Sequence, residues 1–198
     1  MVGKRATEKT KLLTEIEEPT IREQSINCSE SEQELEDDAV PISEVIRVSE
    51  NGIERKNHFS AFQFDGNHFK LEDTVLVTPE EGKIKPSVTI IKDIFKIEGE
   101  GLMVRAQRFY RPEEVKKTGG GTWESRDARE LFYSCHLDEF PADGVMHECV
   151  IHLVPLHKPL PDRKENPGFV VRKFYDYVNQ KVRSLTDKDC KGVLPRSV

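Results

Sequence analysis

The aromatic residues of this chain are confined to its last 140 positions, and this distribution constrains the fold more than any other feature. The first aromatic residue is Phe59, and all fifteen aromatic side chains of the 198-residue sequence lie from there onward. Buried aromatic rings are a major source of core stability. Residues 1–57 therefore have little with which to build a core, and we expect the folded domain to begin at His58.

Charge divides the chain at the same place. Residues 1–57 carry 8 Lys and Arg against 14 Asp and Glu, whereas residues 58–198 carry 22 of each. The run of acidic and small polar residues from Ser29 to Asp38 is typical of disordered sequence. We predict a disordered acidic tail over residues 1–57. The charge balance of the remainder disfavours direct DNA binding, which needs clustered Lys and Arg.

The cysteines and the N-terminus indicate an intracellular protein with reduced thiols and no metal site. None of the cysteines belongs to a CxxC pair, and their spacing matches no zinc module. No apolar run approaches the roughly 18–20 residues that cross a bilayer, so no membrane span is expected. The start MVGKRATEKTK lacks the apolar stretch of a secretory signal. The cysteines are Cys28, Cys135, Cys149 and Cys190.

Short strands separated by turn signals are predicted from His58 onward. The alternation over Phe59–Phe64 stops at Asp65-Gly66, which indicates a hairpin. Further strands are predicted over Asp73–Pro79, Leu102–Pro112 and Val145–Pro155. The apolar phase changes within Ser87–Gly99, which indicates a bulged strand.

This pattern favours a mainly β fold. Near-helical spacing after Phe169 predicts a strand that passes into a helix over Lys173–Leu185. Because no βαβ alternation occurs, we predict a distorted antiparallel β-barrel with a C-terminal helix. The domain is assigned to residues 58–185, between the disordered N-terminal tail and an irregular C-terminal tail over residues 186–198.

Two motifs resemble a zincin signature and a phosphate-binding loop. The first does not have the spacing that its model requires, and the second does not have the residue order. In HECVIH the histidines His147 and His152 are five apart in a β-branched stretch, whereas a zincin places them four apart on a helix. In KTGGGT the lysine Lys117 precedes the glycines, and no helix pattern follows as a phosphate loop requires. No set of residues in the sequence suggests catalysis, so we expect neither an enzyme nor a bound cofactor.

The order of motifs in the folded region resembles the bromo-adjacent homology (BAH) domain. The resemblance extends over about residues 58–185. Among BAH proteins, the sequence most resembles plant transcriptional regulators that read a repressive histone H3 methyl-lysine mark. The resemblance implies a β-barrel-like fold, a nuclear location, chromatin binding and a role in gene silencing. Its motifs are LEDTVLV, FYRPEEV, RELFYSCHLDEF, VMHECVIHLVP and NPGFVVRKFYDY.

The resemblance also implies where a histone peptide would bind. In the plant readers three aromatic side chains form a cage for trimethyl-lysine, and a histidine and an aspartate contact the peptide. The corresponding positions here are Ser87, Arg108 and Tyr110 for the cage and His136 and Asp138 for the peptide. Only Tyr110 supplies a ring, and Arg108 shares its strand face.

Loss of two aromatic faces has a large expected effect. Each face contributes about 1–2 kcal/mol to holding the methylated ammonium. Without two of them, binding weakens roughly 30- to 800-fold at about 1.4 kcal/mol per decade. We therefore predict a non-enzymatic chromatin-binding module that acts in transcriptional repression through contacts with other silencing proteins.

Two alternatives remain open. The chain could read methyl-lysine on the histone H3 tail with a cage rebuilt from Trp123 or Phe132, in which case one of those rings lies beside Tyr110. It could instead bind nucleic acid, in which case a contiguous basic patch forms on the surface. The residues of that patch would be Arg105, Arg108, Arg111, Lys116 and Lys117.

Overall fold

The computed structural model describes residues 38–193, apart from residues 53, 118, 122 and 126, and this part is mainly β. Its strands are β1 (Val40–Pro41), β2 (Arg47–Asn51), β3 (Glu54–Phe59), β4 (Ala61–Phe64), β5 (Asn67–Lys70), β6 (Thr74–Val77), β7 (Ser87–Ile97), β8 (Leu102–Tyr110), β9 (Glu130–Pro141), β10 (Val145–Glu148), β11 (Ile151–Leu153), β12 (Phe169–Asp176) and β13 (Lys181–Ser184). Two 3-10 turns, η1 (Pro112–Glu114) and η2 (Ala142–Gly144), and the helix α1 (Asp187–Val193) complete the described elements. None of the helical segments in this part has the length and apolar character needed to cross a membrane.

The predicted hairpin and bulged strand are both confirmed. Strands β4 and β5 pair antiparallel around Asp65 and Gly66, whose φ angles of 46° and 70° are the positive values that a two-residue type I′ turn requires. The register between β7 and β8 shifts between Ile91 and Asp93. The change of apolar phase in the sequence therefore marks a real irregularity of the strand.

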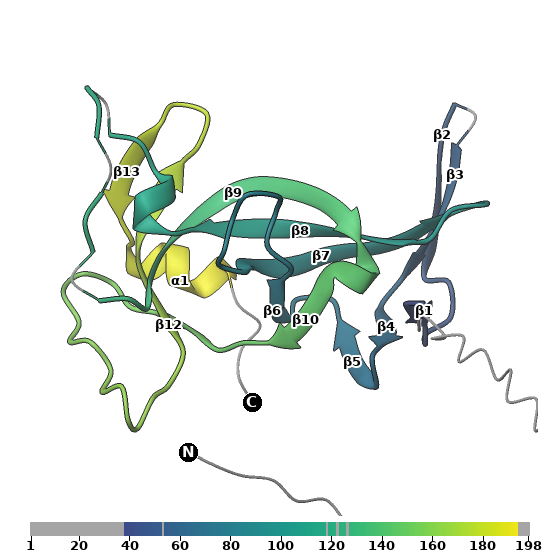
Figure 1. Cartoon of the computed structure of the whole chain (residues 1–198), viewed down its shortest axis with the longest axis horizontal. Helices are drawn as coiled ribbons and strands as arrows, with labels where there is room; N and C mark the ends of the chain where they lie inside the picture. The colour runs from purple at the N-terminus through teal and green to yellow at the C-terminus, as the bar shows by residue number, and fades with distance from the viewer. Residues whose placement is uncertain (1–37, 53, 118, 122, 126, 194–198) are drawn as a thin grey trace, which may run out of the picture. The chain divides into compact units, whose positions relative to one another are not determined.

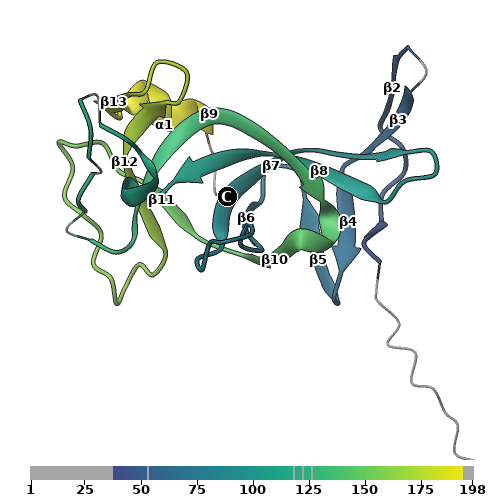
Figure 2. The same cartoon turned by 45° about the horizontal axis from the view of Figure 1, so that its top comes forward.

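The large sheet is strongly curved but not closed. Its strand order is β10-β6-β7-β8-β9-β12-β11, and the long strands β7, β8 and β9 lie side by side in Figures 1 and 2. The edge strands β10 and β11 pair with different neighbours, although only residues 149 and 150 separate them in the chain. Strand β12 is parallel to both β9 and β11, so the expected antiparallel barrel is corrected to an open mixed sheet. The long connection between β11 and β12 permits the parallel pairing, which a tight turn cannot.

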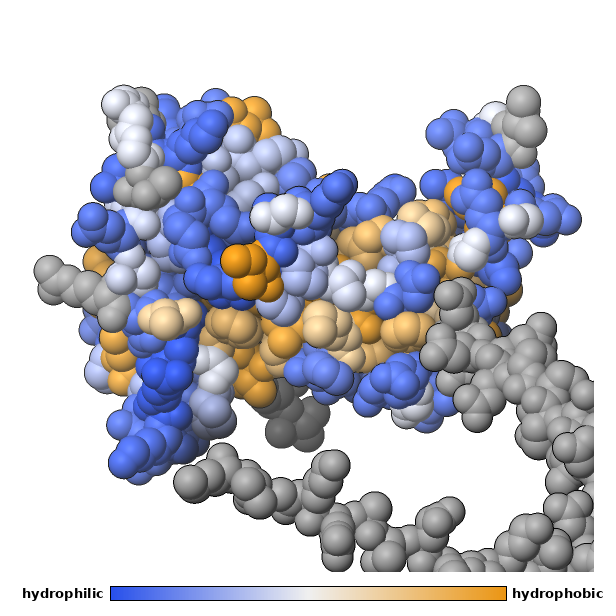
Figure 3. All heavy atoms as spheres, viewed as in Figure 1, coloured by the Kyte–Doolittle hydropathy of each residue, from blue (hydrophilic) through white to orange (hydrophobic). Residues whose placement is uncertain are grey.

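The core is built from the aromatic residues that the sequence placed in this region. Five phenylalanine side chains are almost completely buried, and four of them fall in three separate clusters, with Phe62 and Phe69 in one, Phe109 in a second and Phe132 in a third. Polar and charged residues cover most of the face shown in Figure 3, with smaller apolar areas between them. The buried phenylalanines are Phe62, Phe69, Phe95, Phe109 and Phe132.

The ordered domain begins earlier than His58, so the predicted boundary at residue 57 is wrong within the described residues. Strands β2 and β3 form a hairpin, and β3 continues the large sheet by pairing with β7. The hairpin is held by His58, which is 4% exposed. Its ring nitrogens lie 2.7 Å from Ser49 Oγ and 2.8 Å from Asp93 Oδ1. Backbone pairing and one buried polar network thus order a segment that has no aromatic residue; the rest of the predicted tail, residues 1–37, lies outside the described residues.

The predicted helix over Lys173–Leu185 is also wrong. This segment forms the β12–β13 hairpin, in which the Asp176 carboxylate accepts hydrogen bonds from the backbone N–H groups of Val178 and Asn179. An aspartate that binds the backbone two and three residues ahead favours a turn over a helix. The helix α1 lies instead at Asp187–Val193, within the range predicted to be irregular.

We expect His58→Ala to lower the free energy of unfolding by about 2–3 kcal/mol, because Ser49 and Asp93 each lose a hydrogen-bond partner in a partly buried position. Urea denaturation of the full chain measures the change. The control Ser49→Ala removes one of these bonds and should cost about 1 kcal/mol. Equal losses in the two variants would contradict the role given to the His58–Asp93 bond.

Candidate functional site

The end of strand β8 brings two of the predicted site residues together. Arg108 and Tyr110 are two positions apart on β8, so their side chains leave the strand on the same face, as the sequence alternation predicts. The guanidinium carbon of Arg108 lies 5.2 Å from the centre of the Tyr110 ring. This is the geometry of a cation–π contact. The aromatic face of Tyr110 is therefore already occupied by a cation of the protein itself.

Three carboxylates hold the Arg108 guanidinium in this position. Its side chain is 10% exposed, and Nη1 donates to Glu80 at 2.5 Å and to Asp138 at 3.4 Å. Nη2 donates to Glu114 at 3.3 Å. Burial opposes the charge, but the hydrogen bond to Glu80 and the three negative charges outweigh it and raise the pKa of Arg108. The cation is thus fixed by partners from the loop after β6, from η1 and from β9.

Sequence reasoning missed Glu80 and Glu114. The second of these is fixed in turn by the backbone, because its Oε2 accepts a hydrogen bond of 2.7 Å from the N–H of Arg111. The FYRPEE motif contained a signal for this, since an acidic residue shortly after a proline suits the first turn of a helix. Nothing in the sequence signalled Glu80, which reaches Arg108 across 28 positions of the chain.

Tyr110 also contacts the predicted peptide-binding residues. Its hydroxyl lies 2.6 Å from Nδ1 of His136, and Nε2 of that histidine lies 3.4 Å from Asp138. Burial is the main cause that raises the pKa of Tyr110 to about 12, so the phenol remains protonated in its contact with Nδ1. Arg108, Tyr110, His136 and Asp138 therefore form one continuous cluster.

Two further tyrosines extend this cluster. The ring of Tyr175 meets Tyr110 edge-on with centroids 5.1 Å apart, and Tyr177 stacks on His136 at 4.4 Å. His136 also stacks on Tyr110 at 6.0 Å. Neither tyrosine was predicted from the sequence, because the apolar spacing of their segment indicates a helix. As part of the end of β12 and the turn that follows it, they reach the same face as Tyr110.

Ser87 lies in a cleft beside this cluster, which we call the acidic cleft. The cleft has a volume of about 630 Å³ and contains Ser87, Arg108 and Asp138 in its lining. All five predicted site residues therefore lie in one region. The charged residues of the lining are Glu80, Arg108, Asp138, Glu139 and Asp143.

Trp123 and Phe132 do not take the place of the missing cage rings. They pack against each other with ring centroids 6.1 Å apart, and Lys173 lies over both. Phe132 is completely buried. Tyr110 packs against the buried cluster that contains Phe132, but in the described part of the chain the rings stacked on Tyr110 or edge-on to it are those of His136 and Tyr175.

The basic residues proposed for a nucleic-acid surface are mostly engaged within the protein. Arg105 pairs with Glu139, and Arg108 is held by carboxylates. Arg111 donates to the carbonyl of Pro86 and lies over a phenylalanine ring. Since phosphate binding needs free cations, these contacts disfavour Arg105, Arg108 and Arg111 as phosphate ligands.

The histidines of the HECVIH motif lie in strands of the sheet. His147 lies in β10 and His152 in β11, so the predicted single strand over Val145–Pro155 is broken into two strands with different partners. Between them, burial raises the pKa of the Cys149 thiol to about 11, which makes it a poor nucleophile. The described residues contain no group of three His, Cys, Asp or Glu side chains arranged to hold a metal ion.

Ser49, His58 and Asp93 form a chain of partners like that of a hydrolase triad, which the sequence did not suggest. The guanidinium of Arg47 lies 3.0 Å from the same ring nitrogen of His58 that faces Asp93. Because the histidine is buried and all its ring nitrogens are engaged, the network is explained by its role in joining β2 to β7.

Comparison with known proteins identifies the fold and the family. The sequence model of the BAH domain matches residues 67–186. The structure is similar to the BAH domain of yeast Rsc2, with a TM-score of 0.53 and 17% sequence identity, over 70% of this chain and 58% of the Rsc2 chain. The chain thus spans less than two thirds of that relative, and at this identity the likeness shows the fold alone. With more than half of its sequence matched, this chain belongs to the BAH domain family, whose members are chromatin-associated modules.

Proposed function

We propose that this protein is a nuclear chromatin-binding module of transcriptional repression that docks through protein–protein contacts and does not read methyl-lysine. The observation that supports this is Arg108, which lies over the Tyr110 ring and is bound by Glu80, Glu114 and Asp138. The likeness of the motifs to those of plant BAH regulators supports the repressive role. Other silencing proteins are the partners expected for such a module.

The free energies of interaction favour Arg108, rather than an incoming methylated lysine, at the face of the Tyr110 ring. A trimethyl-lysine would gain about 1–2 kcal/mol from a single desolvated ring. To reach that ring it would have to displace a nearly buried guanidinium from its carboxylates, and breaking such a pair costs about 3–5 kcal/mol. The methylated side chain therefore has no net advantage at this position.

The acidic cleft suits a basic segment of a chromatin protein, such as the histone H3 tail. Its lining has four carboxylates and the single cation Arg108. Arg105 and Lys83, outside the lining, pair with Glu139 and Glu80, so an excess of negative charge remains at Asp143. Opposite charge across an interface speeds association and selects the partner. Binding of this kind depends on the positive charge of lysine, which methylation preserves, and it should be insensitive to the mark.

We expect the full chain to bind trimethylated and unmethylated H3 peptides with dissociation constants that differ by less than tenfold, because Arg108 excludes the methylated group from Tyr110. Isothermal titration at two salt concentrations measures this, and added salt should weaken both complexes alike. Asp143→Lys should weaken both severalfold, whereas Glu100→Lys, an exposed charge reversal at the β7–β8 turn, should not. A preference above tenfold for the methylated peptide would refute the proposal.

A methyl-lysine reader with a rebuilt cage is the second candidate. Tyr175, Tyr177 and His136 gather beside Tyr110, and a cage could form from these rings if His136 moved out of the stack. Tyr177 is 40% exposed and can be replaced without disturbing the core. If this candidate holds, the wild-type chain prefers the methylated peptide by more than tenfold and Tyr177→Ala loses that preference.

A further inference from the structure

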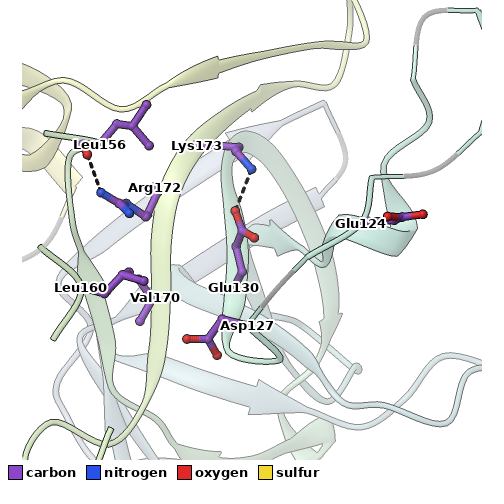
Figure 4. Close-up of a pocket in the computed structure, with 8 residues that line it drawn as sticks. All are labelled: Glu124, Asp127, Glu130, Leu156, Leu160, Val170, Arg172 and Lys173. Carbon is purple, nitrogen blue, oxygen red and sulfur yellow. Dashed lines mark hydrogen bonds and ion pairs between the residues drawn. The ribbon is translucent and has the colours of Figure 1, made fainter. Parts of the chain in front are cut away.

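A second surface hollow lies away from the cluster around Arg108, between β12, the start of β9 and the connection from β11 to β12. Its volume is about 320 Å³, at the lower limit of small-ligand sites. Figure 4 shows Leu156, Leu160 and Val170 on one side of this hollow and carboxylates on the other. We call it the leucine groove.

The apolar side of the leucine groove is exposed although its residues are aliphatic. Leu156 is 56% exposed and Leu160 is 47% exposed, while Val170 forms a buried floor. Both leucines lie on the proline-rich connection, next to Pro155, Pro159 and Pro161. Proline limits the conformations that such a segment loses when it binds a partner, so contact with these leucines costs little ordering entropy.

The two cations in the groove are committed to acceptors of the protein. Arg172 donates through Nη2 to the carbonyl oxygens of Leu156 at 2.6 Å and Lys158 at 2.8 Å, so it holds the connection in place. Lys173 donates to Glu130 at 2.8 Å and lies over the Trp123 ring. The Nε of Arg172 has no hydrogen-bond partner among the described residues, but it is buried and does not face an incoming ligand.

The acidic side keeps a free negative charge. Asp127 is bound to Arg129, and Glu130 is shared by Lys173 and Ser125. Glu124 is exposed and has no hydrogen-bond or ion-pair partner among the described residues. With three carboxylates and two cations, the lining carries a net charge of −1 and would be neutralised by one positive charge.

We propose that the leucine groove is a second docking site, for a peptide segment in which an aliphatic residue directly precedes a lysine or arginine. The aliphatic side chain packs on Leu156 and Leu160, and the cation reaches Glu124. The charge complementarity selects a basic partner over an acidic one. This site is independent of the acidic cleft and of the function proposed for it.

The test is a titration of the full chain, labelled at leucine methyl groups for NMR, with the synthetic peptide acetyl-Gly-Leu-Leu-Arg-Gly-amide. We expect saturable shifts of the Leu156 and Leu160 methyl signals at submillimolar to millimolar peptide. The charge-reversed peptide, with Glu in place of Arg, should bind at least threefold more weakly. Glu124→Lys should weaken the arginine peptide by at least the same factor.

Matched variants separate the groove from general surface effects. Leu160→Ser should abolish the saturable shift at Leu156, whereas Leu137→Ser, also an exposed leucine at 50%, should leave it unchanged. Glu100→Lys is the matched control for Glu124→Lys and should leave binding of the arginine peptide unchanged. The proposal is overturned if no saturable shift occurs, if the two peptides bind equally, or if the control variants weaken binding as much as the groove variants.

Discussion

Replacing Ser87 with Tyr and Arg108 with Trp in the same chain is expected to create methyl-dependent binding of histone H3 peptides, with a preference of at least tenfold for the trimethylated form. The two substitutions place rings at the two predicted cage positions and remove the guanidinium from the face of Tyr110. Two added faces are worth about 2–4 kcal/mol. The carboxylates that now bind Arg108 would instead face the ligand cation. Titration of both peptides against wild type and double variant measures the change.

The matched control for this experiment is Tyr110→Ala in the doubly substituted chain, which should abolish the methyl preference. Thermal unfolding of each variant establishes that it is folded, since Arg108 is nearly buried and its loss disturbs several partners. If the folded double variant binds both peptides equally, the cage positions have been assigned to the wrong residues. If Tyr110→Ala keeps the preference, the ring that binds the methyl group lies elsewhere.

Gly168→Ala is expected to lower the free energy of unfolding by about 3 kcal/mol or more. The φ angle of Gly168 is 123°, a conformation that costs an alanine about 1–3 kcal/mol. An added Cβ would also lie 2.5 Å from the carbonyl oxygen of Val150. That oxygen accepts a hydrogen bond of 2.8 Å from the N–H of Phe169, which begins the parallel pairing of β12 with β11. The clash would therefore disturb the start of the pairing between β11 and β12.

Gly82→Ala is the control for Gly168→Ala. Its φ angle is 80°, and nothing lies within 4 Å of an added Cβ, so only the backbone conformation is penalised. We expect a loss of about 1 kcal/mol, measured by urea denaturation in parallel with the first variant. If the two variants lose the same stability, contact with Val150 is not what makes position 168 intolerant of a side chain.

The local features of the fold could be predicted because they depend on neighbouring residues. The Asp65-Gly66 turn, the bulge in β7 and the extent of β8 each follow from side-chain alternation or from the backbone freedom of one residue. Motif order also predicted a peptide site at Ser87, Arg108, Tyr110, His136 and Asp138. The structure brings these residues into one region, and their role in binding stays a prediction.

The failures of sequence reasoning share one physical cause. The hairpin of β2 and β3 is ordered by Asp93, which is 35 positions from His58 in the chain. The segment Lys173–Leu185 has apolar residues at helical spacing, but the pairing of β12 with β9 and β13 and the turn at Asp176 outweigh that local preference. Tertiary pairing can override helix propensity, which amounts to less than about 1 kcal/mol for most residues.

By itself, the sequence determined a β-rich BAH fold and the strand face that Arg108 and Tyr110 share, because these depend on residue identity and on the alternation of one strand. Only the tertiary structure decided what Arg108 does there. The loop after β6, η1 and β9 converge to supply Glu80, Glu114 and Asp138, and the partners of a buried charge are set by the fold. That convergence holds a cation of the protein over the ring of Tyr110.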